Sequence, residues 1–316
     1  QRQMCIRDST TTYPLSIPLA IAAFQTLGLE RLPASKLIFP GYALALSLLL
    51  YGYLRRRASS AVAGLATLAL ATSPLFQRHA AIGYANLPLA FAFSGAVFLA
   101  AWAEEDPDQQ DRRKLRLAAG LFFVAAAWIR PEGLALSALA ALFLVGRALW
   151  MGSGQGRPGA AALIIPLAVY AAFWMLTSPL VYGGRTTTGD AGLAAMNGIA
   201  AGNLHLNELL HLLRYFAGQW FDLRTWGLLG FVLLTLFVLV PFGRDFSFRK
   251  PSAGPLLIGL IVLGAFLGIY YLLSFDPTHD LSWWLSTGFT RMILPGVILI
   301  WTGLIGSFFS EPAQGN

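Results

Sequence analysis

The sequence predicts an all-α membrane protein, a bundle of about nine or ten transmembrane helices joined by short loops. Of its 316 residues, 56% are hydrophobic and only 12% are charged, whereas soluble domains carry about 25% charged residues. The mean hydropathy is +0.62. Apolar stretches long enough to cross a hydrocarbon layer roughly 30 Å thick, about 20 residues each, recur along the whole chain. They leave no room for a separate soluble domain, so we expect one transmembrane domain over residues 10–316.

Ten apolar stretches are candidates for these spans. They lie at 13–29, 36–54, 58–76, 82–103, 114–130, 132–150, 160–182, 226–243, 254–274 and 288–308. Nine are clear spans. The first carries Pro14 and Pro18 near its start, so it is either a span or a re-entrant segment. The sequence shows no internal repeat and no low-complexity tract.

Basic residues in the short loops predict the orientation of the bundle. The net charge of +7 is spread over few residues that lie between spans, as the positive-inside bias predicts, and we expect no nucleic-acid partner. Arg55, Arg56 and Arg57 should be cytoplasmic. Alternating sides from there places every other basic loop on the cytoplasmic side as well, namely Arg112, Arg113, Lys114 and Arg116, then Arg147 and Arg157, then Arg244, Arg249 and Lys250.

The first nine residues, "QRQMCIRDS", do not resemble a signal peptide, because they have no apolar core. Their codons would match a transposon end used to prepare sequencing libraries. We interpret residues 1–9 as a sequencing or cloning scar and expect the natural chain to begin upstream. The only cysteine, Cys5, belongs to this stretch, so no disulfide or thiolate chemistry is expected.

Four outward segments hold the polar residues that are candidates for chemistry. They are 76–91, the short "WIRPEG" turn at 128–133, the longest outer loop at 183–225, and 274–295. The candidate side chains in them are Arg78, His79, Tyr84, Asn86, Arg130, Glu132, His279, Asp280 and Arg291. Arg291 falls within the last apolar span, where an arginine needs a carboxylate or a ligand phosphate as partner.

The "WIRPEG" turn allows two interpretations. Pro131 suits the first turn of a helix, Glu132 then lies at the positive end of that helix, and Arg130 simply extends its charge to water. Alternatively, Arg130 faces an interior cavity and binds a phosphate, because a guanidinium forms bidentate hydrogen bonds with phosphate oxygens. The residues alone leave both interpretations open.

The end of the longest outer loop predicts an amphipathic helix lying in the outer interface. Leu206, Leu209, Leu210, Leu213 and Phe216 recur at helical spacing, and Trp220 and Trp226 would anchor the helix. His205 and His211 are six residues apart and point to different faces, so we expect no metal site. His79 either faces water or belongs to a site, and Trp283 and Trp284 are expected in the interfacial aromatic belt.

Several short motifs, in this order, resemble the family 39 type of membrane glycosyltransferases, relatives of the protein mannosyltransferases and of the bacterial enzymes that put aminoarabinose on lipid A. They are "YPLSIPLAIAAF" (13–24), "KLIFPGYALALSLLLYGYL" (36–54), "HAAIGYANLPLAFAF" (79–93), "WIRPEGLAL" (128–136) and "HDLSWWLSTGFTRMILP" (279–295). The resemblance implies a GT-C fold in the bacterial inner membrane, with an active site open to the periplasmic or extracellular face.

That resemblance also implies the reaction and its partners. A sugar would move from a polyprenyl-phosphate donor to a lipid, glycan or protein acceptor, with no cofactor. Arg130, Arg291 and Arg78 are our candidates for the donor phosphate, and His79, Tyr84, Asn86, Glu132, His279 and Asp280 for the lining of the site. The family's catalytic aspartate would lie in a loop upstream of this chain, so we expect the chain alone to be inactive. Asn86 also stands where the family commonly has an aspartate.

Three other functions are alternatives. A transporter or flippase of lipid-linked sugars would also have many spans and intramembrane arginines, but such proteins commonly show internal repeats. A ligase or polymerase of surface polysaccharide would suit a large outer loop, whereas the "WIRPEG" and "GYANLP" motifs do not match it. A non-catalytic scaffold has no positive support in the sequence.

Overall fold

The computed structural model describes residues 16–26, 37–81, 85–106, 108–150, 156–182, 187–202, 204–239, 253–276 and 279–309, and these are all α-helical or connecting segments. The predicted all-α class is therefore confirmed. The helices are α2 (Ser16–Thr26), α4 (Ile38–Arg55), α5 (Ser60–Ala71), α6 (Pro74–Ala81), α7 (Asn86–Glu105), α8 (Gln109–Ile129), α9 (Pro131–Trp150), α10 (Gly156–Tyr182), α11 (Thr187–Ala200), α12 (Leu206–Gln219), α13 (Leu223–Trp226), α14 (Leu229–Leu239), α15 (Ala253–Leu273), α16 (Leu281–Met292) and α17 (Leu294–Phe308).

Within the described residues, five helices are long and apolar enough to cross a membrane. They are α4, α7, α9, most of α10, and α15, and the number rises to seven if the bent pairs α5–α6 and α16–α17 each form one span. The other three predicted spans correspond to helices that fall short of that measure. Two of them, α2 and α14, have 11 residues each within the described part, and α8 carries a run of charged residues in its first turns. The chain is thus a multi-pass helical membrane protein.

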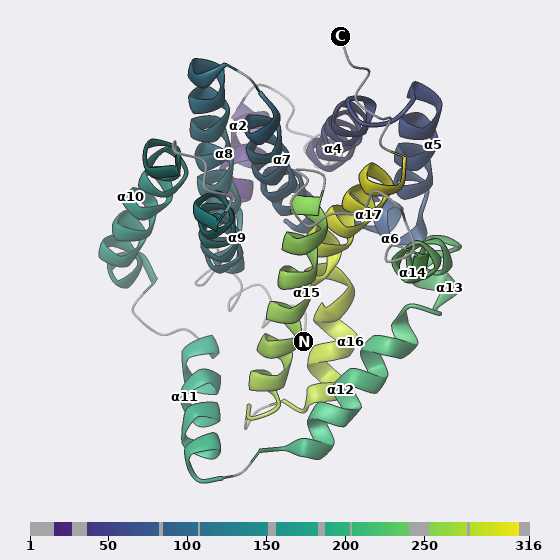
Figure 1. Cartoon of the computed structure of the whole chain (residues 1–316). Coiled ribbons are helices and arrows are strands. Elements are labelled where there is room, and N and C mark those ends of the chain that lie inside the picture. The colour runs from purple at the N-terminus through teal and green to yellow at the C-terminus, as the bar shows by residue number, and fades with distance from the viewer. Residues whose placement is uncertain are drawn as a thin grey trace.

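The centre of the bundle is α7. Of its apolar window, 83% is buried, against 17–39% for the four other single spans. Figure 1 shows α4, α8, α9, α15 and α17 arranged around it. A helix buried on all sides is apolar on all sides, which explains why the sequence of α7 reads as one continuous hydrophobic run.

Helices α15 and α17 approach each other closely through glycines. A Cβ on Gly259 would lie 2.8 Å from the carbonyl oxygen of Gly296, and a Cβ on Gly303 would lie 2.5 Å from the backbone nitrogen of Leu256. Small residues of this kind let the backbones of membrane helices pack against each other. The α15–α17 pair is therefore one of the closely packed contacts of the bundle.

Two of the predicted spans are bent, and proline explains both bends. The stretch 58–76 breaks into α5 and α6 with an angle of 62°, and Pro74 is the first residue of α6. The last stretch breaks into α16 and α17 with an angle of 46°, immediately before Pro295 in the first turn of α17. A proline cannot continue the preceding helix but suits the first turn of the next one. Arg291 consequently lies in the last turn of α16, at the bend, and not inside a straight span.

Helices α11 and α12 extend beyond the bundle as two separate arms (Figure 1). The expected helix over 203–226 forms as α12 and the short α13. Leu212 is the fully buried residue of α12, whereas Leu206, Leu210 and Leu213 are exposed, and the position of this helix in the outer interface stays a prediction. Part of the predicted apolar stripe thus faces away from the protein, whereas Phe216 packs against Phe289 of α16. Helix α12 also contacts α15, and Tyr215 contacts α16.

The basic residues predicted to share one side gather at one end of the bundle, which we call the basic end. Arg57 binds Glu105, and Arg147 lies 3.4 Å from Glu104. Arg116 reaches the same end from the start of α8. The end of α4, the end of α7, the start of α8 and the end of α9 therefore meet there. Arg157, Arg244, Arg249 and Lys250 lie outside the residues whose side chains are described.

Candidate functional site

At the opposite end, a tight turn joins α8 to α9 and fixes the backbone of Arg130. Arg130 is extended, with φ −149° and ψ 147°, as expected for a residue that precedes proline. The N–H of Gly133 donates to the carbonyl oxygen of Arg130 over 2.9 Å. Gly133 has no room for a side chain, because a Cβ there would lie 2.1 Å from the carbonyl oxygen of Ala126. The hydroxyl of Ser137 closes the hairpin by donating to the carbonyl oxygen of Phe123 over 3.1 Å.

The guanidinium of Arg130 is held inside the protein. Its Nε donates to Oε2 of Glu132 over 3.2 Å and its Nη2 to Oε1 over 3.0 Å, so the pair is bidentate. Its Nη1 donates to Oδ1 of Asn86, in the first turn of α7. Arg130 and Asn86 are only 9% and 1% exposed, which favours the interpretation that Arg130 faces the interior over the one in which it extends to water.

A second segment brings Arg291 to the same region. Tyr270, near the end of α15, lies within the electrostatic reach of Arg291, Arg130 and Glu132. Its hydroxyl oxygen occupies the space beside Gly288, 2.8 Å from where a Cβ would be. The charges of Arg130, Glu132 and Arg291 thus all act on Tyr270, although these residues come from the α8–α9 turn, α16 and α15.

His79 completes the group from α6. Its Nε2 lies 3.4 Å from the carbonyl oxygen of Thr290, the residue before Arg291, and its side chain is only 2% exposed. The charges of Arg291 and Arg78 both act on its ring. We call His79, Asn86, Arg130, Glu132, Tyr270 and Arg291 the Arg130 cluster. Its members come from five segments that are far apart in the sequence.

Two of the other predicted site residues lie elsewhere. Asp280 is the N-cap of α16, where its Oδ1 accepts from the N–H of Trp283 over 2.7 Å, and eleven residues of helix, roughly 16 Å, separate it from Arg291. His279 lies beside Asp276 at the same end of α16, with 3.5 Å between Nδ1 and Oδ2. Neither residue belongs to the Arg130 cluster, because α16 carries them to its far end.

The last two predicted site residues are Arg78 and Tyr84. Arg78 is exposed on α6, and its charge acts on Asp222 at the start of α13 as well as on His79. It therefore lies at the border of the cluster. The hydroxyl of Thr225 and the N–H of Arg224 hold the pKa of Asp222 below its usual range. Tyr84 lies outside the described residues.

Sequence reasoning missed three members of this region. The sequence analysis does not single out Tyr270 or Tyr215, and Thr290 contributes only its backbone carbonyl. Tyr215, on α12, donates to the carbonyl oxygen of Leu285 over 3.5 Å and packs edge-on against Phe289, and burial raises its pKa. A tyrosine within the last two turns of an apolar span, as Tyr270 is, would have been the available signal.

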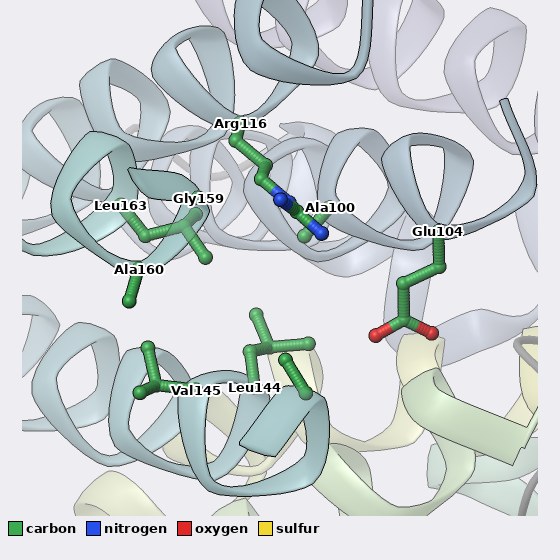
Figure 2. Close-up of a pocket in the computed structure, with 9 residues that line it drawn as sticks. Ala100, Glu104, Arg116, Leu144, Val145, Gly159, Ala160 and Leu163 are labelled. Atoms are coloured by element: carbon green, nitrogen blue, oxygen red, sulfur yellow. The ribbon is translucent and has the colours of Figure 1, made fainter. Parts of the chain in front are cut away.

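A pocket at the basic end differs from the Arg130 cluster in kind. Figure 2 shows Arg116 reaching between Gly159 and Ala100, with Glu104 at the edge and Leu144, Val145 and Leu163 on the apolar sides. Its volume is about 20 Å³, which holds about one water molecule. A Cβ on Gly159 would lie 1.8 Å from Nη1 of Arg116, so Arg116 itself fills the space. This pocket is part of the packing of four helices and has no room for a sugar or a lipid headgroup.

The described residues contain no group of three or more His, Cys, Asp or Glu side chains placed to hold a metal ion. The chemistry available to the Arg130 cluster is therefore that of two guanidinium groups, one carboxylate, one amide, one imidazole and one phenol. Guanidinium groups bind and stabilise anionic oxygens.

Fold and cluster together define a class, a multi-pass helical membrane protein with a buried, arginine-containing polar site at the end opposite its basic loops. Comparisons with protein-family models, with characterised proteins and with solved structures give no match for this chain. Its function is therefore argued from the site itself.

Proposed function

We propose that this protein belongs to the membrane glycosyltransferases of the GT-C type and that the Arg130 cluster binds the phosphate of a polyprenyl-phosphate sugar donor. The observation that carries the proposal is that two arginines from separate segments, the buried Arg130 and the half-buried Arg291, both act electrostatically on the buried Tyr270. An arginine held away from water, as Arg130 is, is costly to keep, and such residues mark functional sites by default.

The chemistry of a lipid-phosphate donor fits this arrangement. When the bond between the sugar and the phosphate oxygen breaks, negative charge grows on the departing phosphate, and positioned cations stabilise it. Arg130 is positioned in advance, because Glu132 and Asn86 fix its guanidinium from two sides. The apolar surfaces of the surrounding helices suit a polyprenyl chain. The acceptor is a lipid, a glycan or a protein, and the working face is the periplasmic or extracellular one.

The test measures donor binding and sugar transfer separately. The full chain is placed in nanodiscs, and binding of a polyprenyl-phosphate-linked hexose is measured for the wild type, Arg130→Ala and Arg291→Ala. Charge-assisted hydrogen bonds contribute about 1.5–3 kcal/mol each, so each variant should bind the donor roughly 10- to 150-fold more weakly. Arg214→Ala, which removes an exposed arginine from α12, is the matched control and should bind as the wild type does.

Unchanged donor binding in both arginine variants would refute the proposal. Movement of the intact lipid-linked sugar between leaflets, without any transfer to an acceptor, would instead support the transporter or flippase. Donor binding, measured apart from sugar transfer, is the measurement that decides the proposed function.

A further inference from the structure

The start of α16 carries an indole ring that its neighbours hold in one orientation. The imidazole of His279 stacks on the ring of Trp283, with 4.1 Å between the ring centroids. Trp284 meets Trp283 edge-on at 4.8 Å, and its own Nε1 donates to Oδ2 of Asp276 over 3.1 Å. The same carboxylate oxygen lies 3.5 Å from Nδ1 of His279. These contacts fix the ring of Trp283, although 43% of this residue stays exposed.

The surface around this ring is polar. Three other residues of α16 are exposed, and all of them carry a hydroxyl group, namely Ser282, Ser286 and Thr287. The exposed surface of α12 differs, because it includes several leucines. A helix that lies in a lipid surface buries an apolar face there. The exposed face of α16, with one aromatic ring among hydroxyl groups, therefore suits a polar ligand better than lipid.

The charged groups near Trp283 favour a neutral ligand over an anionic one. Asp276 and Asp280 are acidic, and the basic residue of α16 is Arg291 in its last turn, eight residues or about 12 Å further along the helix. Asp280 is exposed, and its Oδ1 accepts from the N–H of Trp283 over 2.7 Å. Because a carboxylate has about four acceptor positions, Asp280 can accept further hydrogen bonds from the hydroxyl groups of a ligand.

The start of α16 lies at the end of the bundle from which α11 and α12 extend (Figure 1). Near the end of α15, the hydroxyl of Tyr271 donates to the carbonyl oxygen of Leu204, so the segment before α12 packs against α15 at this end. Arg291 lies in the last turn of α16. One helix therefore carries Trp283 near its start and a proposed phosphate-binding arginine near its end.

We propose that the exposed ring of Trp283 binds a pyranose ring of a neutral glycan by stacking, with Asp280 accepting hydrogen bonds from its hydroxyl groups. The face of an aromatic ring is electrostatically negative, and the C–H groups on the face of a pyranose carry a slight positive charge. Ligand sites combine aromatic surface with a few placed polar groups in this way. The inference rests on the proposed function in one respect, since it identifies this glycan as the acceptor, held on the helix that carries Arg291.

The experiment measures glycan binding without donor and without sugar transfer. The full chain in nanodiscs is titrated with maltotetraose, cellotetraose and chitotetraose, and binding is followed by saturation-transfer NMR with empty nanodiscs as the blank. The wild type should bind at least one of these neutral oligosaccharides. Trp283→Leu stays apolar but loses the ring, so it should bind about tenfold more weakly, whereas Trp283→Phe keeps a ring and should stay within about threefold of the wild type. Trp150→Leu, which replaces an exposed tryptophan at the basic end, is the control and should bind as the wild type does.

The outcomes separate this inference from the proposed function. Absence of binding to all three oligosaccharides overturns the inference, and so does equal binding by Trp283→Leu and Trp283→Phe, because stacking requires a ring. Quenching of the Trp283 fluorescence by brominated lipids, taken as the difference between the wild type and Trp283→Phe and unchanged by any glycan, would assign Trp283 to the interfacial aromatic belt and make the inference wrong. Donor binding by the Arg130 and Arg291 variants decides the proposed function, whichever result the glycan titration gives.

Discussion

The two ends of the bundle both hold arginines beside glutamates, but the segments that these ion pairs join differ. At the basic end, Arg147 of α9 reaches Glu104 of α7, and Arg57, after α4, reaches Glu105 of α7. Each of these pairs joins segments more than 40 residues apart. At the other end, Arg130 binds Glu132, two residues along the same turn. The interhelical partner of Arg130 is a neutral amide, Asn86.

This difference indicates different roles for the same residue types. A charge pair between distant helices holds those helices in place, and removing one partner leaves a buried charge alone. A pair within one turn contributes little to the position of any helix. It does fix the direction of the guanidinium, and fixed direction is what a binding site requires. The basic end therefore serves the fold, and the fixed guanidinium at the other end is consistent with the ligand site that we propose there.

The largest effect is expected from Gly133→Ala in the α8–α9 turn. The added Cβ would lie 2.1 Å from the carbonyl oxygen of Ala126 and 2.6 Å from its carbonyl carbon, and backbone atoms cannot move aside as a side chain can. We expect a loss of about 5 kcal/mol, at the top of the range for single substitutions, seen as loss of monodisperse protein in detergent.

The control for that variant is Gly146→Ala in the same helix, α9, where a Cβ would meet nothing within 4 Å. Alanine favours helix over glycine by up to about 1 kcal/mol, so this change should leave stability equal or higher. Equal stability of both variants would show that the turn does not depend on Gly133 and would weaken the account of how Arg130 is positioned.

A smaller effect is expected at the basic end from Arg147→Met. The side chains of Arg147 and Glu104 are 3% and 11% exposed, so loss of the arginine leaves a carboxylate buried without this partner, at a cost of about 3 kcal/mol. The double variant with Glu104→Met should recover most of that loss, because two apolar side chains can replace a buried pair. Thermal unfolding in detergent measures both. Donor binding should be unchanged in the double variant, and a large loss of binding there would contradict the division of roles between the two ends.

Asn86→Asp tests the neutral partner of Arg130. A carboxylate there would add a negative charge next to the guanidinium and compete with a donor phosphate for it. We expect the dissociation constant of the donor to rise about tenfold, equivalent to about 1.4 kcal/mol, with little change in stability. Asn197→Asp, the same substitution at an exposed position of α11, is the control. Tighter donor binding by Asn86→Asp would mean that the amide is not there to keep the site cationic.

The sequence predicted the fold class and part of the site. Particular residues show which features it could not predict. The length of the apolar stretches predicted α7, α9 and α15, and Pro131 predicted the start of α9. The same information did not predict the bends after α5 and α16, because hydropathy continues through them while the backbone direction changes. The sequence predicts polar site residues in separate outward segments, and the structure brings five of them into one region, namely His79, Asn86, Arg130, Glu132 and Arg291.

The residues that sequence reasoning assigned differently depend on tertiary contacts. His279 and Asp280 share an outward segment with Arg291, but helical rise carries them to the far end of α16. Tyr270 enters the cluster only because Gly288 on another helix leaves space for its hydroxyl. Neither relation is visible in spacing along the chain, since both depend on how two helices are set against each other.

The smallest effect concerns Asp222, the carboxylate beside Arg78 at the border of the cluster. Asp222 is the N-cap of α13, where it accepts from the N–H of Arg224 over 3.0 Å and from the hydroxyl of Thr225 over 2.6 Å. Asp222→Ala should cost about 1 kcal/mol, the usual contribution of an N-cap. Asp222→Asn keeps a capping oxygen and should cost less.

The pH dependence of stability tests whether the charge of Asp222 causes the difference between the wild type and Asp222→Asn. Because the bond from Thr225, followed by that from Arg224, holds the pKa of Asp222 below its usual range, the charged form stabilises the folded state. This stabilisation is present above the pKa of an unfolded aspartate, about 3.9, and is lost as the pH falls through the lowered pKa of the folded state. The difference in Tm between the wild type and Asp222→Asn should therefore be constant from pH 7 to pH 5 and disappear towards pH 2. A difference in Tm that persists at low pH would mean that hydrogen-bond geometry, and not the charge of Asp222, causes the effect. Asp222 would then not be the charged partner that holds Arg78 at the border of the cluster.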